Sequence, residues 1–236
     1  LREEAEYAAS DEPPYPSVTL AEEATTVEKK EENALPADYS EPPSFLQDDT
    51  PTYSGTTFGT LMHKAMEMID FTTLEPTEAA IRTRIQELAA KNVFTEEETK
   101  TLLSHRRNRN PVQGIRTFME SPLCQAMKES TVIRKEMPFS ILLPAHSFYP
   151  DCEAGEKIFL QGVMDCMLEN QEGILIIDYK TDRFMSEEDL RNHYKVQLQV
   201  YGEAAKKLLG KPVLHLYLWS FTYGKMIEVP KLVTGD

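Results

Sequence analysis

Charged side chains stand at the end of an aliphatic run, GILIIDYKTD at 173–182. Four residues of the kind that fill a sheet interior lead directly into Asp178, and Lys180 follows two residues later. Charged groups avoid the core, so a buried strand keeps a carboxylate and an ammonium at its end only when other groups satisfy them. This strand end is therefore a candidate for chemistry that needs a carboxylate beside a cation.

A second carboxylate, Asp165, is predicted to face Asp178. The tetrapeptide NQEG at 170–173 is typical of a tight turn between two strands. If the hairpin is symmetrical about that turn, Asp165 lies opposite Asp178, and directly opposed residues have Cβ atoms about 4.5–5.5 Å apart. Like charges at that separation destabilise a sheet. Alternation along the strand puts Lys180 on the face of Asp178.

Three arrangements would satisfy this pair of carboxylates. They could share one proton, Lys180 could neutralise them in a structural salt-bridge cluster, or they could chelate a divalent cation beside Lys180. Hard oxygen ligands suit Mg²⁺ or Mn²⁺, and such a site polarises a phosphoryl oxygen and activates water near neutral pH. Two aspartates and one lysine alone leave both the salt bridge and the metal site open.

The elements that must position these residues follow from the hydrophobic periodicity. Apolar residues recur every three or four residues in the first half of the body, and the period changes to two from residue 131. A later amphipathic segment, with Ser186 as its N-cap and Gly210 at its end, is typical of a crossover helix. The pattern predicts an α/β fold with a mixed sheet flanked by helices and a helical N-terminal part. We expect helices at 55–71, 77–93, 95–107, 111–127 and 186–210, and strands at 131–143, 157–169, 173–180, 213–221 and 224–233.

Composition and charge divide the chain into a tail and a body. Residues 1–50 hold 14 acidic and 3 basic residues, are rich in Pro and Glu, and have few periodic apolar residues. We interpret them as a linker and predict one domain over 51–236. Most of the net charge of −14 belongs to the tail, whereas 81–135 holds 11 Lys and Arg against 6 Asp and Glu. Its stretch HRRNRN at 105–110 is the place to look for phosphate contacts, although a solvated helical face has the same composition.

Other sequence features narrow the class of protein. The three cysteines have no CxxC spacing, which indicates neither a disulfide framework nor a zinc or iron–sulfur site. No apolar run approaches the roughly 20 residues that a membrane span needs, and we expect a cytoplasmic protein. A GxxxxGK[ST] loop is also missing, so no helicase motor lies within these 236 residues.

Several motifs together resemble the RecB-family nuclease domain of the PD-(D/E)XK superfamily. They are GVMDCMLE, DYKTD and HYKVQLQVYGEA, preceded by GTTFGTLMHKAME with its single histidine and by PSFLQ at 43–47. Their order and spacing, over about residues 43–205, are most similar to the C-terminal nuclease domain of AddA-type helicase-nucleases. The resemblance implies a restriction-endonuclease-like core.

The resemblance also implies roles for individual residues. It implies that the metal is bound by His63, Asp165, Asp178 and the backbone carbonyl of Tyr179. It makes Lys180, Asp178 and Asp165 the catalytic residues. Supporting or DNA-contacting roles fall to Glu136, Gln197 and Tyr201, of which Tyr201 can equally be a packing residue.

The implied function is that of a Mg²⁺-dependent deoxyribonuclease, with Mn²⁺ as a possible substitute. It would act as an exonuclease on single strands that upstream helicase domains of the same protein deliver, together with an AddB-type partner subunit. The process would be double-strand break repair by homologous recombination. The resemblance implies no iron–sulfur cluster, because the four cysteines that hold one in the AddB-type partner are lacking. A catalytically silent nuclease fold used as a docking scaffold is the alternative.

Overall fold

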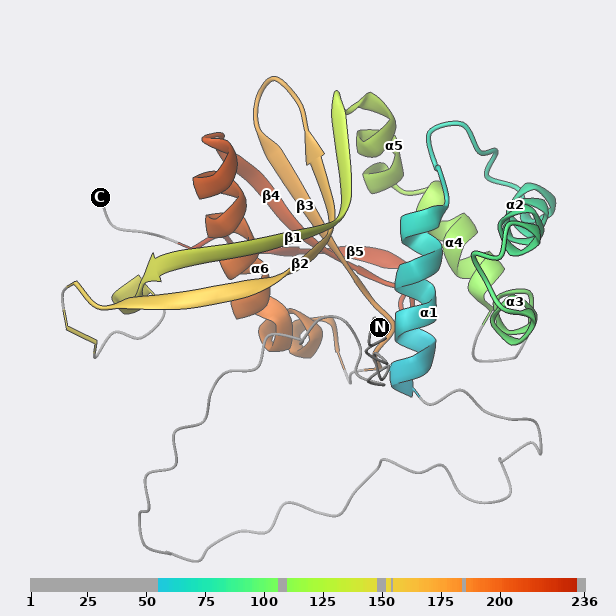
Figure 1. The fold of residues 1–236 in the computed structure, drawn as a ribbon, viewed down its shortest axis with the longest axis horizontal. Helices are drawn as coiled ribbons and strands as arrows, with labels where there is room; N and C mark the ends of the chain where they lie inside the picture. The colour runs from blue at the N-terminus through green and yellow to red at the C-terminus, as the bar shows by residue number, and fades with distance from the viewer. Residues whose placement is uncertain (1–54, 106–109, 148–151, 154, 184–185, 233–236) are drawn as a thin grey trace, which may run out of the picture. The chain divides into compact units, whose positions relative to one another are not determined.

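A computed structural model of the chain describes residues 55–105, 110–147, 152–153, 155–183 and 186–232 (Figure 1). The predicted linker, the PSFLQ motif and residues 106–109 of the basic stretch lie outside these ranges. The predicted domain boundary at residue 51 and the predicted phosphate contacts of that stretch stay predictions. Within the described ranges, no helix is long and apolar enough to cross a bilayer.

The centre of the fold is a five-stranded sheet in the order β1-β2-β3-β4-β5 (Figure 1). Neighbouring strands are antiparallel except β3 and β4, which are parallel. A parallel pair needs a crossover connection, and helix α6 (Glu187–Leu209) provides it. The predicted mixed sheet is therefore confirmed. The strands are β1 (Val132–Pro144), β2 (Lys157–Glu169), β3 (Ile174–Lys180), β4 (Val213–Ser220) and β5 (Lys225–Val229).

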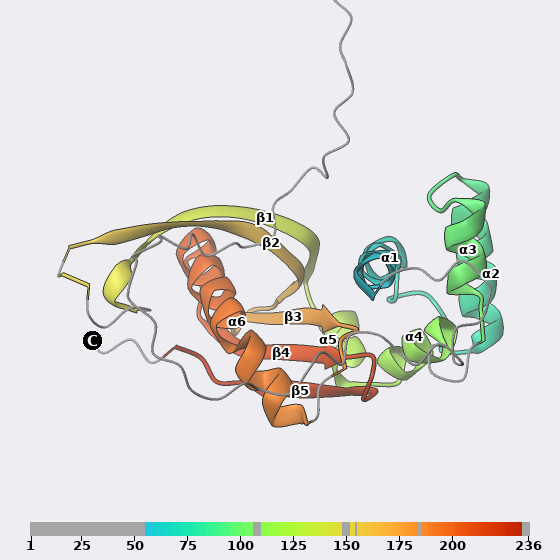
Figure 2. The same cartoon turned by 90° about the horizontal axis from the view of Figure 1, so that it is seen from below.

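Helix α6 begins and ends where the sequence predicts. Ser186 is its N-cap and accepts a hydrogen bond from the backbone N–H of Asp189. Gly210 ends the helix with φ 65°, a left-handed conformation that glycine adopts without a steric penalty. The sheet residues that the helix covers include Ile176, Leu216 and Leu218. Figure 2 shows the long β1–β2 hairpin curving around the same helix.

Among the described residues, five helices precede the sheet. The expected single helix at 111–127 is wrong, because the chain forms two helices there. Ser121 accepts a hydrogen bond from Cys124 N as the N-cap of a new helix, and Pro122 has no N–H to continue the old one. A short 3-10 turn, Ala145–Ser147, follows β1. The five helices are α1 (Gly55–Met68), α2 (Glu78–Ala90), α3 (Glu96–Leu102), α4 (Pro111–Met119) and α5 (Pro122–Glu129).

The sheet packs a hydrophobic cluster on each face. Ile177 and Tyr179 of β3 join the cluster formed with α1, α2, α4 and α5, whereas Ile176 joins the cluster under α6. Side chains alternate along a strand, so Asp178 is on the α6 side with Ile176. On β2, Met164 and Met167 both belong to that cluster although they are three residues apart, so strict alternation does not place Asp165 there. A common face for the two aspartates stays a prediction.

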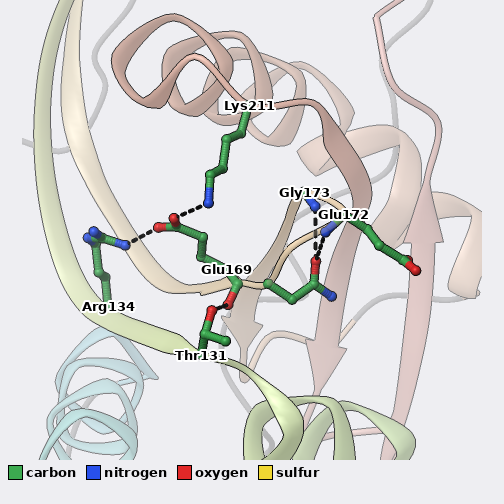
Figure 3. A network of polar contacts seen from close by, with 7 residues as sticks. Thr131, Arg134, Glu169, Glu172, Gly173 and Lys211 are labelled. Atoms are coloured by element: carbon green, nitrogen blue, oxygen red, sulfur yellow. Dashed lines mark hydrogen bonds and ion pairs between the residues drawn. The ribbon is translucent and has the colours of Figure 1, made fainter.

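The hairpin between β2 and β3 has the predicted register. Cys166 pairs with Ile177, and continuing this register by one position aligns Asp165 with Asp178. Asn170 closes the turn, since its Oδ1 accepts hydrogen bonds from Glu172 N and Gly173 N, both at 2.9 Å (Figure 3).

Glu169, at the end of β2, ties this end of the sheet together (Figure 3). Its carboxylate accepts from Arg134 Nη1 at 2.6 Å and from Lys211 Nζ at 2.5 Å. Its carbonyl accepts from Thr131 Oγ1 at 2.8 Å. These contacts join β1, β2 and the segment that enters β4.

Lys135 of β1 fastens the C-terminal end of α1 to the sheet. Its Nζ donates to the carbonyls of Met66, Glu67 and Ile69 at 2.8, 3.0 and 2.6 Å. The last carbonyls of a helix have no partner within it, so this ammonium acts as a C-cap supplied from a distant strand. The ammonium is partly buried in this position, and burial lowers the pKa of Lys135.

We expect Lys135→Met to lower the free energy of unfolding by about 2 kcal/mol, because three helix carbonyls lose a charged donor. Urea unfolding followed by circular dichroism measures the change. The control is Lys128→Met on the exposed side of α5, for which a change within about 0.5 kcal/mol is expected. Equal losses in the two variants would contradict the capping role.

Candidate active site

The predicted site residues come from five elements and meet at the end of β3. α1 contributes His63, β1 Glu136, β2 Asp165 and β3 Asp178 with Lys180. α1 passes close to the loop after β3 at Gly59, where a Cβ would lie 3.2 Å from Thr181 Oγ1. The remaining predicted residues, Gln197 and Tyr201, come from α6.

His63 and Asp165 form the first contact of the site. His63 Nδ1 lies 3.3 Å from Asp165 Oδ2, and the same oxygen accepts a hydrogen bond from Tyr179 N at 2.7 Å. Burial by itself would lower the pKa of His63, but the charge of Asp165 and the hydrogen bond to it raise that pKa to about 9. In this state the imidazole is a cation at neutral pH. That the carbonyl of Tyr179 binds a metal stays a prediction.

Glu136 completes a cluster with these two residues. β1 pairs with β2 on both sides of it, through Lys135 with Cys166 and Met137 with Met164, which places Glu136 opposite Asp165. Its φ of 48° is rare for a residue with a side chain, and such outliers concentrate at functional sites. Ligand atoms of His63, Glu136 and Asp165 all lie within 4.8 Å of one another.

The charges in this cluster repel. Burial and the neighbouring Asp165 raise the pKa of Glu136 to about 7, although His63 opposes the shift. Carboxylates held together against repulsion are relieved by a cation, and an imidazole with carboxylate oxygens suits a divalent metal ion. The donor set therefore fits the predicted cofactor.

Asp178 is the most deeply buried carboxylate of the site, with 1% of its surface exposed. Lys180 Nζ lies 2.9 Å from its Oδ2, yet neither oxygen accepts a well-oriented hydrogen bond from any described residue. Burial raises the pKa of Asp178 to about 6, although Lys180 opposes the shift. A buried carboxylate oxygen without a partner is costly, which fits a site built for a cation.

Asp178 is not one of the three residues whose ligand atoms cluster within 4.8 Å. The hairpin register, continued by one position beyond Cys166 and Ile177, aligns it with Asp165, and contact of both with one ion stays a prediction. Of the arrangements left open by the sequence, the Lys180 ion pair is present. It places a cation beside Oδ2 and leaves Oδ1 without a partner among the described residues.

Lys180 is held by α6 as well as by Asp178. Gln197 Oε1 lies 3.4 Å from Lys180 Nζ, and Gln197 Nε2 donates to Tyr201 OH at 2.6 Å. Tyr201 also packs edge-on against Phe139 at 5.6 Å between ring centroids, so it has both a packing and a hydrogen-bonding contact. Burial by itself would lower the pKa of Lys180, but Asp178 and Asp165 raise it above the ordinary value.

One residue beside Lys180 was missed by the sequence reasoning. Tyr194 belongs to the apolar stripe of α6, and its ring centroid lies 4.1 Å from Lys180 Nζ. The sequence feature that could have identified Tyr194 is its position three residues before Gln197, because this spacing places both side chains on one face of the helix.

This fold, with acidic residues and a lysine at the end of a central hairpin, is that of a nuclease family. The family model described as the PD-(D/E)XK nuclease superfamily matches residues 40–234, and the chain belongs to that superfamily. The predicted resemblance to this superfamily and the predicted α/β fold class are thereby confirmed.

Curated relatives are named as the A subunit of an ATP-dependent helicase/nuclease. The protein of Acetivibrio thermocellus is 34% identical over 194 residues, which cover 78% of this chain and 14% of the relative. That of Listeria welshimeri is 31% identical over 188 residues, covering 76% and 14%. The chain thus spans about one seventh of the length of these relatives. A solved structure titled "Crystal structure of SSO0001" covers 74% of this chain and 78% of its own at 15% identity, with a TM-score of 0.31 that is too low to support any conclusion.

Proposed function

We propose that the chain is a Mg²⁺-dependent deoxyribonuclease domain of an AddAB-type helicase-nuclease. It hydrolyses phosphodiester bonds as an exonuclease on single-stranded DNA, in double-strand break repair by homologous recombination. The observation that carries the proposal is Asp178, a buried carboxylate with an oxygen that has no partner among the described residues, in register with Asp165 and paired with Lys180. A buried carboxylate oxygen without a partner is costly, and a bound cation would satisfy it, which supports a metal site over a salt bridge alone.

Five groups are proposed to hold the metal: His63, Glu136, Asp165, Asp178 and the Tyr179 carbonyl. Mg²⁺ or Mn²⁺, when bound, would supply Lewis-acid polarisation of the scissile phosphate and acidify the attacking water. The backbone N–H of Tyr179 donates a hydrogen bond to one oxygen of Asp165 and so holds it in place. Asp165 also lies opposite Glu136 on the neighbouring strand, which restricts the distance between the two carboxylates. The chain therefore presents its ligands before the ion arrives, which reduces the ordering that binding requires.

Lys180 is proposed to stabilise negative charge on the phosphate. Its raised pKa keeps it an ammonium at neutral pH, so it donates hydrogen bonds and does not act as a base in this state. Asp178 and Gln197 hold its Nζ from two sides. The same ammonium can orient a water molecule beside the phosphate.

Metal binding is expected to release protons, because His63 must be neutral to bind a metal ion. Its pKa, which burial lowers and Asp165 raises more strongly, is about 9 in the metal-free site, so the proton is present at pH 7.5. The affinity for Mn²⁺ should therefore rise about tenfold per pH unit between about pH 7 and pH 9. Titration calorimetry in two buffers of different ionisation enthalpy measures the released protons.

The matched control for this prediction is His63→Gln. That variant loses the imidazole proton and keeps only the carboxyl protons of Glu136, whose pKa the His63 charge no longer lowers, and of Asp178, so proton release at pH 8 should be clearly smaller than for the unmodified chain. Equal proton release by the two proteins at pH 8 would contradict the proposed ligand role of His63.

The proposed partners are DNA, the helicase domains that would precede this segment, and an AddB-type subunit. The support is the similarity to the helicase/nuclease relatives and the fraction of those proteins that this chain spans. A repair nuclease of a bacterial chromosome works in the cytoplasm, and we place the function there. The central test is metal-dependent degradation of single-stranded DNA by the chain and its site variants, as set out in the Discussion.

A further inference from the structure

The ammonium of Lys180 lies over an aromatic ring. Its Nζ is 4.1 Å from the centroid of the Tyr194 ring, well within the roughly 6 Å of a cation–π contact. Only 12% of the Lys180 side chain is exposed, and desolvation strengthens such contacts. The ring belongs to α6, whereas Lys180 ends β3, so the contact forms only in the folded chain.

A hydrogen bond fixes the ring in this position. Tyr194 OH donates to Asp182 Oδ2 at 2.8 Å, and Asp182 follows Lys180 by two residues. The ring is thus attached through its backbone to α6 and through its hydroxyl to the loop after β3. Two attachments restrict rotation about its χ angles, which keeps the ring face turned toward the ammonium.

The ring restrains Lys180 in a way that a carboxylate does not. Asp178 Oδ2, at 2.9 Å, attracts the ammonium toward this buried carboxylate. Gln197 Oε1 accepts a hydrogen bond from the same ammonium at 3.4 Å. An aromatic face attracts a cation without requiring one N–H to point at a single atom. A donor of the ammonium therefore stays available for a phosphate oxygen.

We propose that Tyr194 is a positioning residue of the nuclease site. Its ring face orients the Lys180 ammonium toward the scissile phosphate, and Asp182 holds the ring in place. The inference rests on the proposed function. It gives a role to a residue that lies within the motif HYKVQLQVYGEA but to which the resemblance assigns none.

The first experiment compares Tyr194→Leu with Tyr194→Phe in the 236-residue chain. We measure the single-turnover cleavage rate of single-stranded DNA at saturating protein, DNA affinity in EDTA, Mn²⁺ affinity and melting temperature. Loss of the ring should slow cleavage roughly 5- to 30-fold, the equivalent of a desolvated cation–π contact. Tyr194→Phe keeps the ring and should stay within about threefold of the unmodified chain. Mn²⁺ affinity should be the same in all three proteins, because no metal ligand changes.

A second experiment varies the charge of the ring face and keeps its size nearly constant. Phenylalanine with one, two or three fluorine atoms is placed at position 194. Each fluorine withdraws negative charge from the face, so the cleavage rate should fall stepwise with fluorine number, whereas a packing role predicts a flat series. Asp182→Ala and Tyr194→Phe remove the same hydrogen bond, and the double variant should be no slower than the slower single variant.

The outcomes separate this inference from the proposed function. If the unmodified chain cleaves DNA and Tyr194→Leu is equally fast, or the fluorinated series is flat, the positioning role is overturned. If Tyr194→Leu loses Mn²⁺ affinity or melts much earlier while the fluorinated series is flat, the ring is only a structural residue. If the unmodified chain does not cleave DNA with either metal, the proposed function fails, and this inference fails with it.

Discussion

Replacing Asp178 by asparagine is expected to lower Mg²⁺-dependent cleavage of single-stranded DNA by about 10³-fold or more, since metal-ion catalysis contributes several kcal/mol. Asparagine has nearly the same shape as aspartate but no charge. Asp178 is 1% exposed, and its Oδ1 has no partner among the described residues. Its contact with Lys180 loses the carboxylate charge, but an asparagine oxygen can still accept a hydrogen bond from that ammonium. The variant should fold and yet bind the metal weakly.

Two measurements separate loss of the metal from loss of the fold. Cleavage of a 5′-labelled single strand is followed on denaturing gels with Mg²⁺ or Mn²⁺. Melting temperature is recorded with and without Mn²⁺, and a stabilising shift is expected for the unmodified chain but not for Asp178→Asn, because a ligand stabilises only the state that binds it.

The matched control is Asp189→Asn at an exposed position in the first turn of α6. It changes the same side chain outside the site and should cleave DNA at the unmodified rate. If the unmodified chain and Asp178→Asn are equally inert while both are folded, the catalytically silent scaffold becomes the better hypothesis. If both are equally active, Asp178 is not a ligand of the reaction centre.

Replacing Lys180 by methionine is expected to reduce cleavage by about 10³-fold while metal binding persists, because the charge that stabilises the phosphate is removed and the ligands remain. Methionine keeps most of the length of the side chain. Removing a cation 2.9 Å from Asp178 also removes repulsion of the metal, so Mn²⁺ affinity should be equal or higher. Asp178→Asn should therefore lose both metal binding and cleavage, whereas Lys180→Met should lose cleavage alone.

Mn²⁺ affinity from titration calorimetry and the cleavage rate at saturating metal are measured on the same samples. Lys206→Met, on an exposed part of α6, is the control for loss of a lysine. An inactive Lys180→Met that also fails to bind Mn²⁺ would show that the lysine maintains the site and does not act on the phosphate. Full activity would exclude any role in the reaction.

Much of the local structure could be predicted from the sequence, because short-range rules control it. The turn at 170–173 predicted the register of the hairpin, which aligns Asp165 with Asp178 when it is continued by one position. Ser186 and Gly210 marked the ends of α6 for the same reason, since caps act within one helical turn. The break at Ser121 was also local, and it was missed although a Ser-Pro pair is a start signal for a helix.

The geometry around those residues was decided by tertiary packing. Lys135 caps a helix that lies more than 60 residues earlier in the chain, and no local pattern indicates such a contact. The positive φ of Glu136 depends on the strand opposite it, and the place of Tyr194 over Lys180 depends on how α6 crosses the sheet. The sequence by itself thus determined which chemical groups are present and which elements carry them. Only the folded chain decided their distances and exposure, because burial and charge repulsion depend on residues that are far apart along the backbone.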